Sequence, residues 1–458
     1  MPELSTAHDA HLSLWQSAVE AAAGSAALED DDTEATDADA QNPATAATAA
    51  VVEAKDPCVD CDEQNLPPHD EELAEMSALH LELAEAELAH NPIDKRIVER
   101  LLEATDGSRG PAGSLFRTAV GLFKVFAGKL SRPVYHNWKR EGGGSIDFST
   151  IEWRIPSKGR VALLSDWGTG YYDAEMVLRA ACAFDPDAII HLGDIYFAGT
   201  ELECRRKFLV PIRRHAHRGS ERAPIPVFNM AGNHDYYSGG YGFHWLLGEL
   251  NDGEAAQPAS YFALRSEDDG WQFLAMDTGY DSRHDVVNSH RFGYIPQADE
   301  IEWLEHKLET FTGSTFLLSH HQAFSNMSSM GGDEDDREPP FDRMNRRLVA
   351  LAEPHAERIA AWFWGHEHNL MIYKPYHGLR ARCIGHSGRP MRIRTLEEEA
   401  SWGYAIEDAR LAPRDGTGWL NHGFEIIDLN GRGNPADVTY YQVLANGIPE
   451  VVWRERLK

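Results

Sequence analysis

From about Thr150 onward, short apolar runs alternate with segments whose apolar positions repeat at helical spacing. The runs at 161–164 and 188–192 are uninterrupted, which is typical of buried strands, and the segment 174–184 between them has one apolar helical face. A repeated order of strand, loop, helix and strand predicts parallel strands covered by helices, which is an α/β fold.

Two pairs of shorter runs have the alternation of antiparallel hairpins, and two further segments have helical spacing. The predicted hairpin strands are 260–266 with 271–279 and 424–429 with 438–443, and the predicted helices are 201–215 and 297–311. The sequence contains no internal repeat. These elements predict one large domain over residues 150–458.

The first 149 residues have a different pattern. Residues 71–103 repeat apolar positions near helical spacing, with a break at Pro92, and residues 115–126 form a second apolar helical face. The second helix either packs on the large domain or attaches to a membrane surface. The run KREGGGS at 139–145 is typical of a linker. The predicted division is an extension (1–70), a helical segment with linker (71–149) and the large domain (150–458).

The extension is acidic and poor in aromatic residues. Residues 1–94 contain 23 Asp or Glu against the single Lys55 and so carry −22 of the formal net charge of −30. Such a segment cannot bury enough apolar surface to offset its ordering entropy, so residues 21–68 are predicted to be disordered. The sequence indicates no protein partner for it. The negative charge argues against nucleic acid as a main ligand.

Three features bear on the cellular compartment. The first residues, MPELSTAHDAHLSLWQ, lack the basic start and apolar stretch of a signal peptide. The chain has no run of 18 apolar residues, so no membrane span is expected. Its five cysteines favour a reducing compartment, and Cys58 with Cys61 supplies only half of a four-ligand zinc site. We expect a cytoplasmic protein.

Polar residues follow five of the predicted strands, where a buried core would usually take another aliphatic residue. The runs are VALLSD, AIIHLGD, VFNMAGN, TFLLSH and WFWGHEH. Functional groups gather at the carboxyl ends of strands in α/β sheets, and Asp, Asn and His are ligands of first-row divalent metals. We therefore predict a metal site with Asp194 as a bridging ligand. The candidate ligands are Asp166, Asp194, Asn233, His320, His366 and His368.

These runs, taken in order, resemble the calcineurin-like metallophosphoesterases, and within them the purple acid phosphatase type. The matching blocks are DWG at 166–168, GD at 193–194, GNHD at 232–235, SHH at 319–321 and GHEH at 365–368. The resemblance covers about residues 158–390. It implies a four-layer αββα sandwich, two divalent or trivalent metal ions (Fe, Mn or Zn) and a small phosphorylated substrate.

The resemblance also implies a role for each site residue. The two metals would share Asp194 and a bridging hydroxide, which would attack the phosphorus. The first metal would take Asp166 and His368, and the second would take Asn233, His320 and His366. His234 would orient the phosphate and protonate the leaving oxygen, and Asp235 would hold the His234 ring.

The first two blocks depart from the family pattern. Gly168 stands where many members have a metal-binding His, and in the purple acid phosphatase type a Tyr from the second block fills that gap. Here Tyr196 comes one residue earlier than in that type. Its phenol either reaches the first metal, which is our expectation, or packs beside the site. A phenolate ligand would stabilise iron(III).

Further residues are candidates for substrate contacts. His321 follows His320 directly and points to the opposite side of the strand end, as a substrate contact or a support for the ligands. His386 and Arg389 follow the last block, where phosphate contacts are expected, and the alternative for Arg389 is a pair with a surface carboxylate. Residues 326–343 form either a lid or a surface insertion.

The predicted function is metal-dependent hydrolysis of a phosphomonoester. The alternative is a phosphodiesterase that acts on small or cyclic nucleotides, and a third reading is a binding module that keeps the fold without the chemistry. The choice of a monoester rests on the resemblance to the phosphatase branch, which is an analogy. Decay of the chemistry would usually remove some of the candidate ligands, and all of them are present.

Overall fold

The computed structural model divides the chain into two compact units, Met1–Ala127 and Gly128–Lys458. The described residues of the first unit lie between 13 and 21 and are helical. Those of the second unit are 133–136, 146–219, 222–282, 297–327, 344–391, 393, 404–414 and 418–458. The predictions that lie outside the described residues are the disordered stretch after Ala21, the helices at 71–103 and 115–126, the linker at 139–145 and most of the segment 326–343.

Two mixed sheets form the centre of the second unit within its described residues. The seven-stranded sheet contains, in spatial order, β1 (Glu152–Ile155), β7 (Phe262–Ser266), β8 (Trp271–Ala275), β9 (Ser314–Ser319), β10 (Ile359–Trp364), β12 (Ala381–Ile384) and β11 (Leu370–Ile372). The six-stranded sheet contains β15 (Pro449–Leu457), β14 (Ala436–Val443), β13 (His422–Asp428), β2 (Arg160–Leu164), β3 (Ala188–His191) and β6 (Val227–Asn229). A small ribbon pairs β4 (His217–Arg218) with β5 (Ala223–Pro224).

The strand pairing follows the predicted pattern. Parallel pairs join β8 to β9, β9 to β10 and β10 to β12 in one sheet, and β2 to β3 and β3 to β6 in the other. The two predicted hairpins are present as the antiparallel pairs β7 with β8 and β13 with β14. The α/β class is therefore confirmed.

Helices flank the sheets in the described part of the second unit. Their bounds are α7 Tyr172–Cys182, α8 Glu201–Glu203, η2 Cys204–Leu209, α9 Val210–His215, α10 Asn233–Tyr237, α11 Tyr241–Leu250, η3 Gly253–Ala255, α12 Gly279–Ser282, α13 Ala298–Thr310, α14 Arg346–Ala352 and η5 Glu353–Arg358. The predicted helix at 201–215 corresponds to α8, η2 and α9, and the one at 297–311 corresponds to α13.

Aromatic side chains pack the two sheets face to face. The ring of Trp153 on β1 lies 5.1 Å from that of Phe228 on β6. Between two other strands of the sheets, the ring of Phe363 on β10 lies 6.5 Å from that of Tyr440 on β14. Each pair joins one strand from each sheet, so the inner faces of the sheets form a common core.

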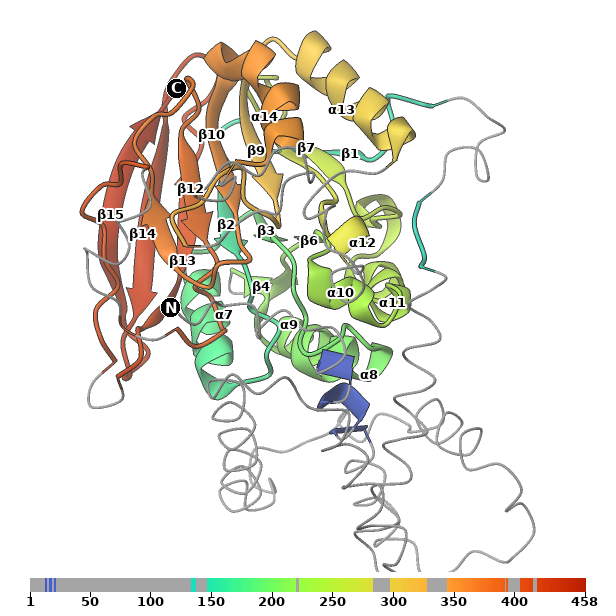
Figure 1. Ribbon diagram of the computed structural model, residues 1–458, viewed down its shortest axis with the longest axis vertical. Coiled ribbons are helices and arrows are strands. Elements are labelled where there is room, and N and C mark those ends of the chain that lie inside the picture. Colours follow the sequence, from blue (N-terminus) through green and yellow to red (C-terminus); the bar gives the residue numbers. More distant parts are fainter. Residues whose placement is uncertain are drawn as a thin grey trace, which may run out of the picture. The chain divides into compact units, whose positions relative to one another are not determined.

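The outer faces of both sheets are covered by helices (Figure 1). On the six-stranded sheet, Val177 of α7 shares a buried cluster with Phe424 and Ile426 of β13. On the seven-stranded sheet, the ring of Trp303 in α13 lies 5.3 Å from the ring of Tyr261, which precedes β7. The order helix, sheet, sheet, helix confirms the four-layer αββα sandwich.

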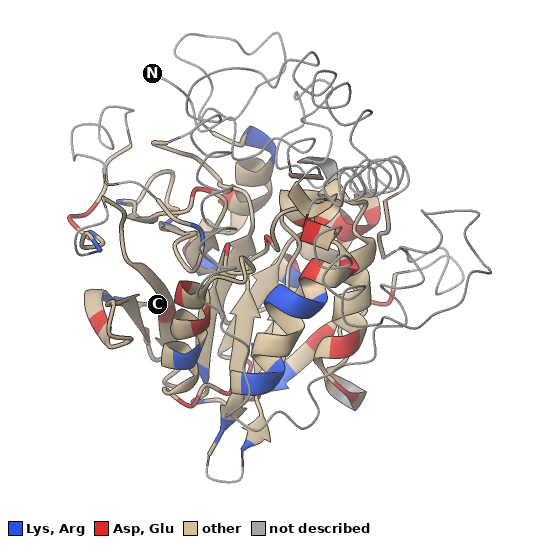
Figure 2. Ribbon diagram, turned by 90° about the horizontal axis from the view of Figure 1, so that it is seen from below, with Lys and Arg blue, Asp and Glu red and all other residues tan. Residues whose placement is uncertain are grey.

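The described helices are short or polar, and the described ribbon is mixed in charge (Figure 2). None of the helices described there is long and apolar enough to cross a membrane. Acidic and basic positions are interspersed over the described ribbon (Figure 2). The described ribbon seen in this view therefore carries both signs of charge.

Candidate metal centre

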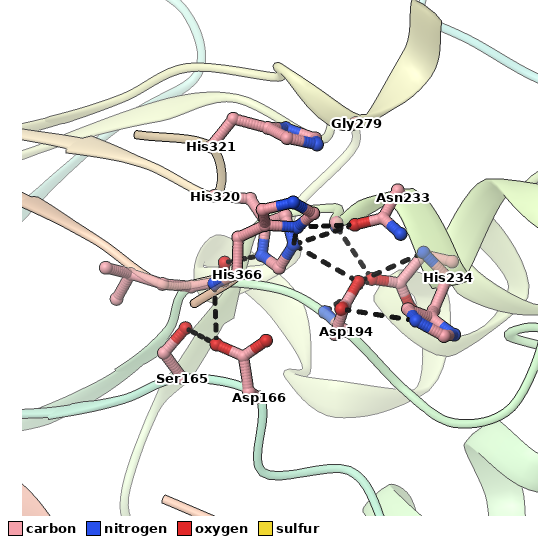
Figure 3. Close-up of polar contacts among 12 residues, drawn as sticks. Ser165, Asp166, Asp194, Asn233, His234, Gly279, His320, His321 and His366 are labelled. Atoms are coloured by element: carbon pink, nitrogen blue, oxygen red, sulfur yellow. Dashed lines mark hydrogen bonds and ion pairs between the residues drawn. The ribbon is translucent and has the colours of Figure 1, made fainter. Parts of the chain in front are cut away.

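The polar residues that follow the predicted strands lie together in the structure (Figure 3). Asp166 follows β2, Asp194 follows β3, Asn233 follows β6, His320 follows β9, and His366 and His368 follow β10. All six are buried, with at most 4% of each residue exposed. Since β2, β3 and β6 belong to one sheet and β9 and β10 to the other, the group forms where the carboxyl edges of both sheets meet.

The first group of donor atoms surrounds the phenol of Tyr196. The phenol oxygen lies 3.1 Å from Asp166 Oδ1, 3.2 Å from Asp194 Oδ2 and 2.9 Å from His368 Nε2. The single hydroxyl proton can serve only one of these acceptors at a time. A cation between the four atoms would satisfy all of them, so this donor set fits a metal ion. The structure thus brings Tyr196 to this group despite its early position in the sequence block.

The second group gathers around the amide oxygen of Asn233. Asn233 Oδ1 lies 3.0 Å from His320 Nε2 and 3.0 Å from His366 Nδ1, and these two nitrogens are 3.2 Å apart. His320 Nε2 is also 3.4 Å from Asp194 Oδ1. Asp194 therefore faces the first group with one carboxylate oxygen and the second group with the other.

Two candidate metal ligands, Asp166 and His320, are oriented by hydrogen bonds at the atom that faces away from the other ligands. Asp166 Oδ2 accepts hydrogen bonds from the Ser165 hydroxyl at 2.7 Å and from the His366 backbone amide at 2.9 Å, which leaves Oδ1 for the first group. His320 Nδ1 donates to the Leu192 carbonyl at 2.9 Å, so the neutral ring presents an unprotonated Nε2 to the second group.

Tyr237 is a supporting residue that sequence reasoning missed. The amide nitrogen of Asn233 donates to the Tyr237 hydroxyl at 2.6 Å, which turns the amide oxygen toward His320 and His366. Tyr237 lies four residues after Asn233 in α10, one helical turn along the same face. That spacing was the available signal.

The backbone is strained at four of the candidate donors. The φ angles are 55° at Asp166, 75° at Asp194, 65° at His366 and 39° at His368. Non-glycine residues in this left-handed region each cost about 1–3 kcal/mol and gather at functional sites, where the surrounding structure holds them. The strain supports a functional role for this edge of the sandwich.

Two motif glycines make room for the donors. A Cβ atom at Gly232 would overlap the carboxylate of Asp194, and one at Gly365 would overlap the hydroxyl of Ser165. In both cases a side chain that follows another strand passes directly over the glycine backbone. The glycines of the GNHD and GHEH blocks are therefore required by packing at the site.

Burial and mutual charge set the protonation of the metal-free centre. Burial, together with the nearby Asp194 charge, raises the pKa of Asp166 to about 7. Burial also acts to raise the pKa of Asp194, but the charges of His320 and His234 hold that pKa well below its usual value. Burial acts to lower the pKa of His320, but the Asp194 carboxylate raises it to about 9. Without metal, Asp194 and His320 therefore form a buried ion pair.

His234 lies beside both groups of donors. Its ring is 4.4 Å from the ring of Tyr196, and its Nε2 is 3.9 Å from Asp194 Oδ2. Its Nδ1 donates to the Phe197 carbonyl at 2.6 Å. Burial lowers the pKa of the imidazole, against the opposing effect of Asp194. The carbonyl of Phe197 thus orients the ring with Nε2 toward the centre.

The role predicted for Asp235 is wrong. Its carboxylate accepts hydrogen bonds from the backbone amides of Gly232 at 2.8 Å, Asp194 at 2.9 Å and Ile195 at 3.2 Å. The ring of His234 is held by a carbonyl instead. Asp235 points back under α10 and ties the loop after β3 to the loop after β6, which positions Asp194.

His321 lies behind the second group. Its backbone amide donates to the Thr278 hydroxyl at 3.0 Å, and its Nδ1 is 3.0 Å from the same oxygen. Its ring is 4.5 Å from the ring of His366. The ligand nitrogens of His320, His321 and His366 lie within 4.8 Å of one another. His321 is therefore placed as a support for the ligands and as a further nitrogen donor for the second group.

The substrate contact predicted for His386 stays a prediction, and the structure places its ring beside β13. Its side chain is 1% exposed and packs against β13, where its Nε2 lies 3.7 Å from Glu425 and a Cβ atom at Gly423 would be 2.7 Å away. Burial lowers the pKa of His386 to about 4. The ring lies against β13, a strand of the six-stranded sheet.

Arg389, three residues further on, does lie at the site. Its guanidinium carbon is 5.3 Å from the centre of the Tyr196 ring and 5.9 Å from that of the Phe197 ring. The side chain is half-buried. The loop that follows β12 thus buries His386 in the sandwich and brings Arg389 over the aromatic rings beside the first donor group.

Comparison with known proteins gives a family match. Residues 159–370 match the sequence model of the family described as calcineurin-like phosphoesterase. That range contains all six strand-end donors, Tyr196 and His234. No curated protein matches the chain in sequence.

Several solved structures are similar to this one at low sequence identity. GAP50, the anchor in the inner membrane complex of Plasmodium, is 15% identical, with 66% of this chain and 89% of that chain covered and a TM-score of 0.45. Purple acid phosphatase PPD1 from yellow lupin (Lupinus luteus) seeds is 15% identical, with 66% and 54% covered and a TM-score of 0.41. A dimetal phosphatase from Danio rerio is 11% identical, with 65% and 99% covered and a TM-score of 0.40.

The second donor group generates a prediction about metal content. His320→Ala removes a buried nitrogen that faces Asn233, His366 and Asp194, so the protein should lose at least one bound metal ion per chain, measured by elemental analysis after purification. His377→Ala is the control, because His377 is exposed and pairs with Glu353 away from the centre. Equal metal content in both variants and in the unmodified protein would contradict the assignment.

Proposed function

We propose that this chain, whose residues 159–370 match the calcineurin-like phosphoesterase family, hydrolyses phosphomonoesters at a pair of metal ions. The observation that carries the proposal is the position of Asp194, whose two carboxylate oxygens face two separate donor groups. One metal would be held by Asp166, Tyr196 and His368, the other by Asn233, His320 and His366, and both by Asp194. Metal ions bound there polarise phosphoryl oxygens and lower the pKa of a water molecule that serves as the nucleophile.

His234 is the proposed proton donor to the leaving oxygen. Its Nδ1 proton is committed to the Phe197 carbonyl, so the ring donates a proton only as the imidazolium, which loses its second proton from Nε2 to the leaving oxygen and returns to the neutral form. The Nε2 atom lies 3.9 Å from Asp194 Oδ2, and Asp194 is the residue that faces both donor groups. The ring is fixed by contacts of 4.4 Å with Tyr196 and 4.8 Å with Tyr237, which keep it from turning away.

The phenol of Tyr196 bears on the identity of the metals. A phenolate is a hard anionic donor and favours a trivalent ion such as iron(III) at the first position. The amide and imidazole donors of the second group suit divalent iron, manganese or zinc. We therefore propose iron at the first position and one of these divalent ions at the second.

The complete donor set supports an enzyme over a binding module that has lost its chemistry. Retaining seven buried polar side chains, four of them on strained backbone, costs stability and has no use in a module without metal. Phosphodiesters are the alternative substrates. The choice between the two ester classes is tested by the assay that follows.

Replacing the shared carboxylate should abolish turnover. Protein loaded with Fe, Mn or Zn should hydrolyse an aryl phosphate, and Asp194→Asn should lower kcat/KM about a thousandfold, because it removes several kcal/mol of transition-state stabilisation. Asp437→Asn should retain activity, because Asp437 lies on β14 and pairs with Arg456. A higher kcat/KM on a bis-aryl phosphate would indicate a diesterase, and no turnover of either ester would favour the binding module.

The role of His234 predicts a dependence on the leaving group. His234→Ala should lower kcat on an alkyl phosphate about 10²- to 10⁴-fold, since an alkoxide needs a proton as it leaves. The loss on 4-nitrophenyl phosphate should be much smaller, because nitrophenolate leaves without a proton. Steady-state rates on both esters measure the difference. Equal losses on the two would show that His234 acts in binding alone.

The proposed iron position has a spectroscopic signature. The iron-loaded protein should show a visible absorption band from charge transfer between phenolate and iron(III), and Tyr196→Phe should remove the band. Tyr172→Phe is the control, because Tyr172 is 69% exposed. A band of unchanged intensity in Tyr196→Phe would assign the chromophore to another residue.

A further inference from the structure

Among the described residues, Arg389 differs from the other cations near the site because it forms no ion pair with an acidic side chain. Lys207 also lies over the Phe197 ring, at 4.6 Å, but its Nζ is 3.5 Å from Glu203. Arg205 lies 4.6 Å from the Trp245 ring and forms an ion pair with Glu201. Within the described part of the chain, the Arg389 guanidinium lies over the Tyr196 and Phe197 rings and forms no ion pair. An uncompensated arginine in a chain with a net charge of −30 is available for an anionic ligand.

The surrounding loop holds Arg389 in place. A Cβ atom at Gly388 would lie 2.8 Å from the Trp167 carbonyl and 3.1 Å from Ala174, so this part of the loop packs directly on the first motif block and α7. The rings of Tyr196 and Phe197 pack against the guanidinium. Cation–π contacts orient a guanidinium but leave its charge and its hydrogen-bond donors free.

The position of Arg389 connects its charge to the reacting phosphate. The Tyr196 ring beneath it carries a phenol oxygen 3.1 Å from Asp166 and 3.2 Å from Asp194, and it also lies 4.4 Å from the His234 ring. The guanidinium is therefore one aromatic ring away from the first donor group and from the proposed proton donor.

A phosphomonoester and a phosphodiester differ in the charge that they present to this cation. Above its second pKa of about 6 a monoester carries two ionised oxygens, whereas a diester carries one. The planar guanidinium binds two phosphate oxygens at once and is always charged. A second ionised phosphate oxygen that does not bind the metal pair is therefore stabilised most by the guanidinium.

We propose that Arg389 binds the second ionised oxygen of a phosphomonoester and so determines the preference for monoesters over diesters. The inference rests on the proposed function and names the group that would decide its substrate class. In this proposal Arg389 binds the substrate, and the strand-end residues together with Tyr196 bind the metals.

The test compares two esters with the same leaving group, 4-nitrophenyl phosphate and bis(4-nitrophenyl) phosphate, on metal-loaded protein. Arg389→Met keeps the unbranched stem over the rings and removes the charge. It should lower kcat/KM on the monoester about 10- to 100-fold, the range for one lost hydrogen bond to a charged group, and change the diester less than about threefold. Arg389→Lys should recover part of the loss. Arg205→Met, the matched control over Trp245, should leave both esters unchanged.

Two further measurements separate the possible failures. Metal content should be the same in Arg389→Met and in the unmodified protein, and a loss of metal would overturn the proposal in favour of a role in holding Tyr196. Equal losses on both esters, or none, would also overturn it. If the unmodified protein hydrolyses neither ester, the proposed function fails, and calorimetric titration with inorganic phosphate decides the role of Arg389. Weaker phosphate binding by Arg389→Met would support the role, and equal binding would refute it.

Discussion

The buried carboxylate of Asp194 is the constraint on which the rest of the site depends. It is fully buried, its φ angle is 75°, and its two oxygens face different donor groups. A charge in such a place is costly unless positive charge surrounds it. His320 Nε2 lies 3.4 Å from Asp194 Oδ1, and a metal pair bound there would supply positive charge on both sides of the carboxylate. The surrounding structure is arranged to keep Asp194 there: Asp235 holds its backbone, and Gly232 makes room for its side chain.

The sandwich matters to the site because each sheet supplies part of the donor set. Asp166, Asp194 and Asn233 come from the six-stranded sheet, and the histidines follow β9 and β10 of the seven-stranded sheet. The distance between the two sets is therefore decided by the packing between the sheets, where Trp153 meets Phe228 and Phe363 meets Tyr440. A substitution in this core would shift the candidate metal ligands without contacting them directly, because close-packed interiors transmit strain.

Sequence reasoning was accurate where one local rule decided the outcome. An apolar strand that ends in a polar residue delivers that residue to the carboxyl edge, so the six strand-end donors could be predicted from position alone. Neighbours in sequence did not give the direction of the Asp235 and His386 side chains. Asp235 adjoins His234, but its side chain turns under α10 to the backbone of Asp194. His386 follows the last block, but its ring enters the sandwich beside Glu425. In both cases the direction of the side chain depends on a loop that spacing does not describe.

The sequence by itself determined the α/β class, the hairpins and the polar residues at the strand ends, because periodicity and strand ends are local properties of the chain, and the layer order was implied by the family resemblance. Only the tertiary structure decided that the early Tyr196 still reaches Asp166 and His368, and that Arg389 lies over aromatic rings with no ion pair among the described residues. These are contacts between residues as many as 200 positions apart. They depend on how two sheets and several loops pack together, and no local pattern encodes that packing.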